Sequence, residues 1–197
     1  LAAFGIDSLE DDPELKSIAD FAARLCDTPS ASVTIVEQQR QRFLARHGLE
    51  SRETPRSVSF CAHAMQGSDL FVIPDATQDP RFADNDLVTG EPNVRFYAGA
   101  PLVTEDGTQL GALCVIDTKP RPEGLTQLQE EGLRVLARSA LRRFVNEREA
   151  MRSRIRPLTA FIRLSRCRAS CSCGFVAAWS NPITLPSHLS TSRPRCP

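Results

Sequence analysis

The chain has 197 residues, of which 41% are hydrophobic, enough for one ordinary domain with a buried core and too few for two full-sized domains. Its formal net charge is zero, yet all 24 acidic residues and only 16 of the 24 basic residues lie within positions 1–151. We see no secretory leader and no apolar run near the ~18 residues of a membrane span. We therefore expect a cytoplasmic protein without a membrane partner, shortened at its start.

The first third of the chain predicts a helix followed by a β-hairpin. Asp12 is suited to cap a helix that begins at Pro13, and the residue before Pro29 disfavours helix, so this helix should end there. Residues 32–36 are rich in β-branched side chains and predict a strand. An imperfect alternation of apolar and polar residues over 41–47 predicts its hairpin partner.

The remainder of residues 1–151, the acidic part of the chain, predicts a short helix, three strands and a long helix. Ser59 is suited to cap a helix over 60–65, and residues 70–73 form an apolar strand. A turn-rich loop spans 75–93, and strands over 94–103 and 109–116 flank an Asp106-Gly107 hairpin signal. An apolar stripe from Leu125 to Met151 predicts an amphipathic helix. This order predicts an α+β fold with an antiparallel sheet.

Residues 152–197 differ in composition from the rest of the chain. They contain eight Arg, no acidic residue, abundant Ser and Pro, and four of the seven cysteines. We interpret this tail as disordered or translated out of frame. An Arg-rich arm for nucleic acid is the functional alternative, but its Arg residues are scattered instead of forming a dense block. Cys167, Cys171, Cys173 and His188 match no common zinc spacing.

Four blocks of the acidic part together resemble bacterial GAF domains of the kind attached to histidine kinases and to enzymes of cyclic dinucleotides. They occur in the expected order and spacing, and the likeness covers residues 5–151. The blocks are Ser59-Phe60-Cys61-Ala62-His63-Ala64, Asp79-Pro80-Arg81-Phe82-Ala83-Asp84-Asn85, Arg95-Phe96-Tyr97-Ala98-Gly99-Ala100-Pro101-Leu102 and Gly111-Ala112-Leu113-Cys114-Val115-Ile116-Asp117.

The resemblance implies a GAF/PAS-like sheet of five or six antiparallel strands with helices on both faces. It also implies a small-molecule cavity between one sheet face and the intervening helices and loops, and a long C-terminal signalling helix. Arg42 departs from the family pattern, since an aromatic residue is expected there. We expect this departure to alter one wall of the cavity without affecting the fold.

The candidate cavity residues lie in the matching blocks. Cys61 and His63 cannot act together as nucleophile and base, because positions i and i+2 of a helix point about 200° apart. Relatives that bind bilin usually have His directly after the Cys, whereas here Ala62 separates Cys61 from His63. We therefore do not expect a bound bilin, and the sequence indicates no other cofactor. Cys61 either packs in the core or serves a ligand or redox role. The full candidate set is Phe60, Cys61, His63, Arg95, Tyr97 and Cys114.

Arg95 and Tyr97 share one face of their predicted strand, so they could bind an anionic or aromatic ligand. The alternative is that Arg95 pairs with Asp75 or Asp84 and closes the long loop. His63 either enters the cavity or binds a backbone carbonyl. The remaining loop carboxylates are typical of turns. We find no pattern that predicts a metal site or a phosphate-binding loop in the acidic part.

Three functions remain open at this point. The first is a sensory module that binds an unidentified small molecule, forms a homodimer through the Leu125 to Met151 helix and regulates an output domain absent from this chain, such as a sensor histidine kinase or a diguanylate cyclase. The chain itself would then not be an enzyme. The second is a thiol oxidoreductase similar to free methionine sulfoxide reductase, with Cys61 and Cys114 as attacking and resolving thiols. The third is a ligand-free dimerisation module.

Overall fold

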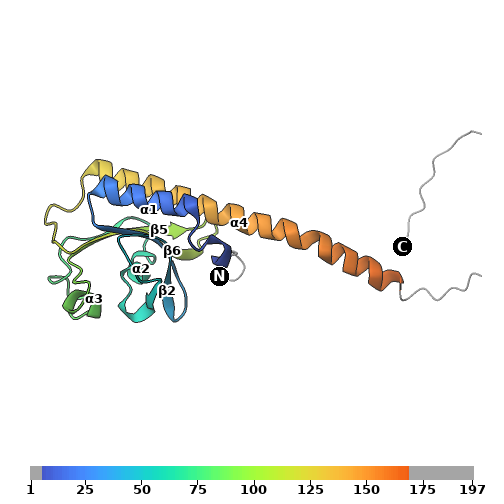
Figure 1. Ribbon diagram of the computed structural model, residues 1–197, viewed down its shortest axis with the longest axis horizontal. Coiled ribbons are helices and arrows are strands. Elements are labelled where there is room, and N and C mark those ends of the chain that lie inside the picture. Colours follow the sequence, from blue (N-terminus) through green and yellow to red (C-terminus); the bar gives the residue numbers. More distant parts are fainter. Residues whose placement is uncertain (1–5, 169–197) are drawn as a thin grey trace, which may run out of the picture. The chain divides into compact units, whose positions relative to one another are not determined.

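The computed structural model describes the backbone of residues 6–168 and the side-chain environments of residues 6–154. A six-stranded sheet is flanked by helices, and the compact unit that contains them ends at Pro157 (Figure 1). The elements in chain order are η2 (Ile6–Leu9), α1 (Pro13–Cys26), β1 (Ser30–Val36), β2 (Arg40–His47), β3 (Glu53–Pro55), η3 (Arg56–Val58), α2 (Phe60–Ala64), β4 (Phe71–Ile73), α3 (Asp86–Thr89), β5 (Phe96–Val103), β6 (Gln109–Asp117) and α4 (Gln127–Arg168).

The strand order is β3-β2-β1-β6-β5-β4, and each neighbouring pair is antiparallel. This confirms the predicted α+β fold. A register shift in the β1–β2 pair brings Val33 opposite Ala45 and Thr34 opposite Phe43, so Leu44 is the extra residue of a bulge. The bulge explains why the alternation of β2 is imperfect in the sequence.

Capping interactions set the start of both long helices. The Asp12 carboxylate accepts hydrogen bonds from the backbone N–H groups of Glu14 and Leu15, each at 3.0 Å. Thr126 and Gln129 form a reciprocal capping box at the start of α4, in which each side chain bonds the backbone N–H of the other residue. The Asp12 cap was predicted from the sequence, whereas the start of α4 was expected at Leu125 and its capping box was not recognised.

The far end of α4 was predicted wrongly. The stripe of apolar residues fades near Met151, yet the helix continues to Arg168. The added segment contains Pro157, whose ring and missing backbone N–H disfavour a helix interior, so local propensity does not account for the continuation. The predictions for residues 169–197 lie outside the described residues.

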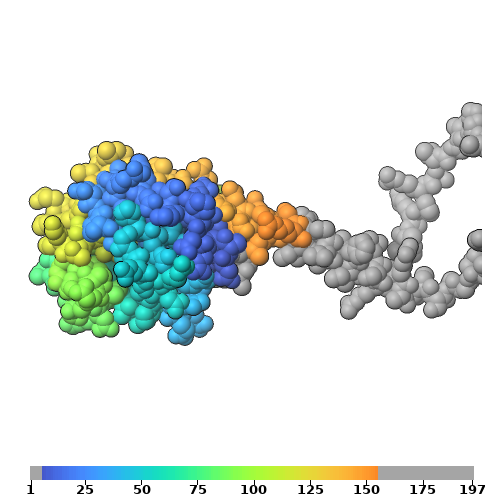
Figure 2. Space-filling model, viewed as in Figure 1, coloured from blue at the N-terminus to red at the C-terminus, as the bar shows by residue number. Residues whose placement is uncertain are grey.

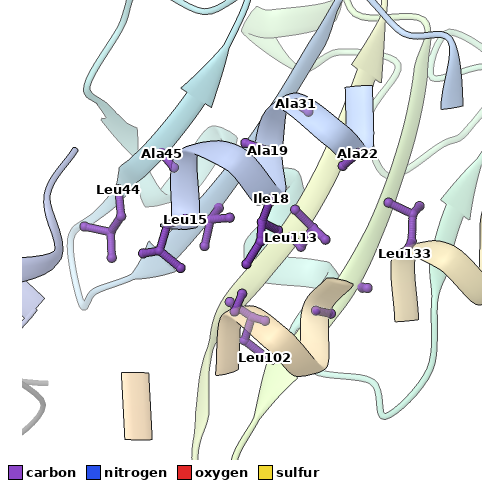
Figure 3. Close-up of a cluster of buried hydrophobic side chains, with 14 of the residues drawn as sticks. Leu15, Ile18, Ala19, Ala22, Ala31, Leu44, Ala45, Leu102, Leu113 and Leu133 are labelled. Carbon is purple, nitrogen blue, oxygen red and sulfur yellow. The ribbon is translucent and has the colours of Figure 1, made fainter. Parts of the chain in front are cut away.

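One hydrophobic core fills the space between the sheet and the pair α1 and α4, which lie side by side on one face (Figure 1). Leu15, Ile18, Ala19 and Ala22 of α1 point toward the sheet in Figure 3. They meet Ala31, Leu44, Ala45, Leu102 and Leu113 of four strands, with Leu133 of α4 beside them. Small residues on α1 allow this close approach to the sheet.

A second core lies on the opposite sheet face, beneath α2, α3 and the loop before β5. Along β6 the side chains alternate between the two cores, since Leu113 and Val115 belong to the first and Ala112 and Cys114 to the second. In Figure 2 the segment after β2 and the loop before β5 cover this layer as adjacent surfaces. Both sheet faces are therefore buried, as the expected helices on both faces require.

Four short elements were not predicted, namely the two 3-10 helices η2 and η3, the strand β3 and the helix α3. β3 is an edge strand of three residues, and α3 is one helical turn inside the loop, capped by the side chain of Asn85. Neither is long enough to produce a periodic pattern. Within residues 6–168, no helix is sufficiently long and apolar to cross a membrane.

Candidate functional site

A cavity of about 110 Å³ lies in the second core, between the sheet, α2 and the loop that carries α3. This volume is well above the ~10–15 Å³ that one water requires and below the ~300 Å³ of the smallest drug-sized pockets. The apolar and aromatic part of its wall comprises Phe43, Leu49, Phe60, Leu87, Pro92, Val94, Tyr97 and Ile116, and the remaining wall residues are Gln41, Ser51, Thr54, Ser59 and Cys61.

The wall contains no Asp, Glu, Lys, Arg or His. Its polar part is built by Gln41 of β2, Thr54 of β3 and Ser59 at the start of α2. The Ser59 hydroxyl donates to the Gln41 side-chain oxygen and accepts from the Ala62 N–H at 3.0 Å. The Oγ1 atom of Thr54 is buried without a hydrogen-bond partner, a property that it shares with Thr28 alone among the side chains described. The Thr54 hydroxyl thus lacks the hydrogen bond that buried polar atoms ordinarily form.

Two cysteines meet behind this wall. The sulfur atoms of Cys61 on α2 and Cys114 on β6 lie 3.5 Å apart, and both side chains are buried. The Tyr97 hydroxyl donates to the Cys61 sulfur at 3.2 Å. The Ser32 hydroxyl lies 3.2 Å from the Cys114 sulfur. Elements 53 residues apart in sequence therefore bring two thiols into contact.

The hydrogen bonds of this cluster favour a thiolate at Cys61. The contact with the Cys114 thiol lowers the pKa of Cys61 against the opposing effect of burial, and the Tyr97 hydroxyl adds to that lowering. The same contact raises the pKa of Cys114 well above its ordinary value. By contrast, burial without a thiol partner raises the pKa of Cys26 to about 11. The pair therefore loses its first proton from Cys61.

An aromatic cluster anchors the long loop over the cavity. Phe82 stacks on Phe60 with ring centroids 4.3 Å apart, and Phe60 in turn stacks on Tyr97 at 5.2 Å. The Arg81 guanidinium pairs with the Asp79 carboxylate at 2.5 Å and lies 4.9 Å from the Phe71 ring centroid. Residues Asp79 to Phe82 thus hold the loop against the sheet.

His63 lies outside the cavity. Its side chain is exposed, whereas that of Cys61 is buried, so the two do not face each other. The imidazole packs edge-on against Phe82 with centroids 4.8 Å apart. His63 was expected either to enter the cavity or to bind a backbone carbonyl. The first expectation is wrong, because the helix turns residue 63 away from the sheet.

Arg95 holds the loop, though not as expected. It directly precedes β5, and its guanidinium donates to the carbonyl oxygens of Val88 at 2.9 Å and Val94 at 3.0 Å. This corrects the expectation of an ion pair with Asp75 or Asp84, because a helical turn at α3 brings free carbonyls within reach. Arg95 is also absent from the cavity wall.

The loop carboxylates serve local turns or face solvent. Asp75 accepts hydrogen bonds from the Thr77 N–H at 3.0 Å and the Thr77 hydroxyl at 2.7 Å, and Asp84 is exposed. Arg42, where the family pattern predicts an aromatic residue, pairs instead with Asp7, Glu10 and Glu37 and does not line the cavity. Residues 6–154 contain no cluster of three ligands that could hold a metal ion.

Of the six predicted site residues, Phe60, Cys61 and Tyr97 line the cavity and Cys114 contacts Cys61 from behind. The contribution of β2 and β3 to the cavity wall, above all that of Gln41 and Thr54, was not predicted from the sequence. Gln41 is only 4% exposed in the structure. A polar residue on the inward side of an alternating strand was the available signal, and the bulge at Leu44 obscured it.

Comparison with known proteins agrees with this arrangement. The sequence model of the GAF domain family matches residues 12–142. A cyclic di-GMP phosphodiesterase of Pseudomonas aeruginosa is 52% identical over 110 residues, which are 56% of this chain and 19% of that protein. The chain thus spans about a fifth of the length of this curated relative.

Solved structures share the fold at low sequence identity. The GAF domain of an Acinetobacter phosphoenolpyruvate-protein phosphotransferase matches with a TM-score of 0.55 and 16% identity, over 70% of this chain and 84% of that one. The free methionine-R-sulfoxide reductase of Neisseria meningitidis matches with a TM-score of 0.55 and 18% identity, over 74% and 87%. The six-stranded sheet flanked by helices is thus the fold of GAF domains. The chain belongs to the GAF domain family.

Proposed function

We propose that this domain is the ligand-binding input module of a signal-transduction protein and not an enzyme in itself. The observation that carries the proposal is the 110 Å³ cavity, whose wall is mainly apolar and includes Leu87 and Val94 from the overlying loop. A ligand there would touch both the sheet and the loop. It would therefore favour one arrangement of the two over another, which signalling requires.

The chemistry of the wall defines the class of ligand. The wall has no Asp, Glu, Lys, Arg or His, and its Cys61 sulfur already accepts a hydrogen bond from the Tyr97 hydroxyl, so a charged ligand would lose its hydration without gaining a free counter-ion. The free Thr54 hydroxyl offers one hydrogen bond. The proposed ligand is thus a small uncharged molecule with an apolar body and one polar group, and neither a bilin nor a metal ion is required.

The path from cavity to output runs through β6 to α4. Cys114 on β6 belongs to the cavity side, whereas its neighbours Leu113 and Val115 belong to the core that packs against α4. A ligand that moves β6 would therefore change the packing of α4. The Pseudomonas relative, a cyclic di-GMP phosphodiesterase, supports an output domain that acts on a cyclic dinucleotide in preference to the sensor histidine kinase expected from sequence.

We further propose that the domain forms a homodimer in the cytoplasm through α1 and α4. Phe21 on α1 and Leu128 and Val135 on α4 remain 48%, 72% and 52% exposed, the large hydrophobic residues so exposed within 6–154. Leu128 and Val135 are one heptad apart, as a helix-pairing seam requires. Leu128→Glu with Val135→Glu should give a monomer by light scattering, and Asn146→Glu on the same helix should not. A wild-type monomer would contradict the dimer.

Phenol is a small uncharged molecule with an apolar ring and one hydroxyl, so it is the probe for ligand binding in the cavity. Benzoate is the matched anionic control. Phenol should raise the midpoint of thermal unfolding and show saturation transfer in NMR, whereas benzoate at the same concentration should do neither. Leu87→Trp should fill the cavity and abolish both effects of phenol, and Asn146→Trp on α4 should retain them. Equal effects of phenol and benzoate, or no effect of phenol, would overturn the proposal.

The thiol oxidoreductase is the second candidate, and the 3.5 Å contact of Cys61 and Cys114 favours it. Against it, free methionine sulfoxide is a zwitterion, and the cavity wall offers no cationic side chain to pair with its carboxylate. We expect no turnover of methionine sulfoxide with dithiothreitol as the reductant. Turnover that disappears in Cys61→Ser would replace the sensory proposal by the enzymatic one.

A further inference from the structure

Helix α2 and strand β6 bring two buried cysteines into contact. Cys61 lines the cavity, and the sulfur of Cys114 lies 3.5 Å from its sulfur on the far side from the cavity. A disulfide requires the sulfur atoms to approach to about 2.05 Å, a movement that a side-chain rotation and a small shift of α2 can supply. No other cysteine within residues 6–154 has a thiol partner, since Cys26, the last residue of α1, is buried without a second thiol beside it.

We propose that Cys61 and Cys114 form a dithiol that a small uncharged peroxide, entering through the cavity, oxidises to a disulfide, and that this disulfide changes the capacity of the cavity for its ligand. The first part stands independently of the sensory function, and the second part rests on it.

The geometry gives the two cysteines different roles. Cys61 is the sulfur that borders the cavity, and it receives hydrogen bonds that stabilise its thiolate, including one from the Tyr97 hydroxyl at 3.2 Å. Cys114 is shielded behind it and lies within reach of any group formed on Cys61. Cys61 is therefore the attacking thiolate and Cys114 the resolving thiol.

The chemistry balances with hydrogen peroxide as the oxidant. The Cys61 thiolate attacks one peroxide oxygen, the O–O bond breaks, and Cys61 becomes a sulfenic acid while the second oxygen leaves as hydroxide. The Cys114 sulfur then attacks the Cys61 sulfur, the S–O bond breaks, and the departing hydroxide takes up the Cys114 proton as water. Two thiols lose two electrons in total, and one peroxide becomes two waters.

The disulfide would act on the ligand site directly. Phe60 and Cys61 are adjacent on α2 and both line the cavity, so drawing α2 toward β6 moves part of the wall. The Tyr97 hydroxyl would also lose the thiolate to which it donates. In a reducing cytoplasm such a bond is transient, which suits a signal and not a structural crosslink.

The first experiment tests the crosslink in the full chain. Fully reduced protein is treated with one equivalent of hydrogen peroxide, blocked with N-ethylmaleimide under denaturing conditions and digested for mass spectrometry. We expect a crosslinked peptide pair containing Cys61 and Cys114, with Cys26 recovered as the alkylated thiol. Cys61→Ser and Cys114→Ser should each abolish the crosslink. Recovery of both cysteines as alkylated thiols, or a crosslink of Cys61 to another cysteine, would overturn the inference.

The second experiment separates this inference from the proposed function. Phenol binding is measured by saturation transfer on reduced and on peroxide-treated protein. Binding that is at least tenfold weaker after oxidation and restored by dithiothreitol is the expected result. Unchanged binding in crosslinked protein would overturn the coupling to the cavity. If the crosslink forms but phenol fails to bind even the reduced protein, the sensory proposal fails and the dithiol chemistry stands.

Discussion

The ring of Tyr97 lies across Gly99, in the space that a β-carbon on residue 99 would occupy. Gly99 is paired in register with Cys114 on the neighbouring strand, so the absent side chain lets the Tyr97 hydroxyl reach the pair of sulfurs. The Gly99 in the third matching block is thus explained by the position of its neighbour's ring and not by a turn.

Substituting Gly99 tests this relationship. Gly99→Ala should displace the buried Tyr97 ring and lower the free energy of unfolding by about 1–3 kcal/mol, the usual cost of overpacking. Urea denaturation provides the measurement. The control is Gly67→Ala, because a β-carbon there would come no closer than 3.7 Å to another atom, so its effect should stay within about 0.5 kcal/mol. Equal effects of the two substitutions would contradict the assignment.

The unpartnered hydroxyl of Thr54 should lower the stability of the ligand-free domain and strengthen the binding of a ligand. Thr54→Val keeps the shape and removes a buried polar atom, so the ligand-free domain should become more stable by about 1 kcal/mol. Phenol should then bind more weakly, because its hydrogen-bond partner is gone.

Thr28→Val is the matched control, since Thr28 has the other unpartnered hydroxyl and does not line the cavity. It should stabilise the domain by a similar amount and leave phenol binding unchanged. Calorimetry of unfolding with and without phenol measures both quantities. A parallel loss of binding in Thr28→Val would show that the effect is not local to the cavity.

Asp12 joins two helices through one carboxylate. One oxygen caps α1, and the other accepts a hydrogen bond from the Arg143 guanidinium of α4 at 2.8 Å. Asp12→Asn should keep the cap and lose the charge, whereas Asp12→Ala loses both, so we expect costs of about 1 and 2–3 kcal/mol respectively. Urea denaturation orders the two variants. An alanine variant no less stable than the asparagine variant would exclude a contribution from the cap.

The β5–β6 turn should be sensitive to acid. Hydrogen bonds from the Thr104 and Thr108 side chains and the Thr108 backbone lower the pKa of Asp106 to about 2. Because the unfolded chain binds this proton near pH 4, the stabilisation is complete above about pH 4 and is lost as the pH falls toward 2. Carboxyl titration by NMR gives the pKa directly. A midpoint at the ordinary value near 4 would contradict the hydrogen bonding.

The difference between wild type and Asp106→Asn isolates this residue from the other carboxylates. The stability gap between the two proteins should be widest above pH 4 and should shrink between pH 4 and pH 2, because the amide cannot titrate. A constant gap for Asp106→Asn would disprove the prediction.

Elements whose causes are local could be predicted from the amino-acid sequence. The Asp12 cap, the Ser59 cap, the Asp106-Gly107 hairpin and the apolar stripe of α4 each depend on residues a few positions apart, so their patterns predicted the structure. The matching blocks likewise predicted the GAF fold, because a fold constrains many positions at once. The C-terminal end of α4 at Arg168 was not predicted, since the apolar stripe that indicates the helix ends near Met151.

The arrangement of the site depends on contacts between distant parts of the chain. The contact of Cys61 with Cys114, the carbonyl partners of Arg95 and the place of Thr54 in the cavity wall all depend on which strands become neighbours in the sheet. The bulge at Leu44 adds to this, because one extra residue reverses which side chains of β2 face the cavity. Pairing between distant segments results from burial of the whole sheet, and no local pattern records it.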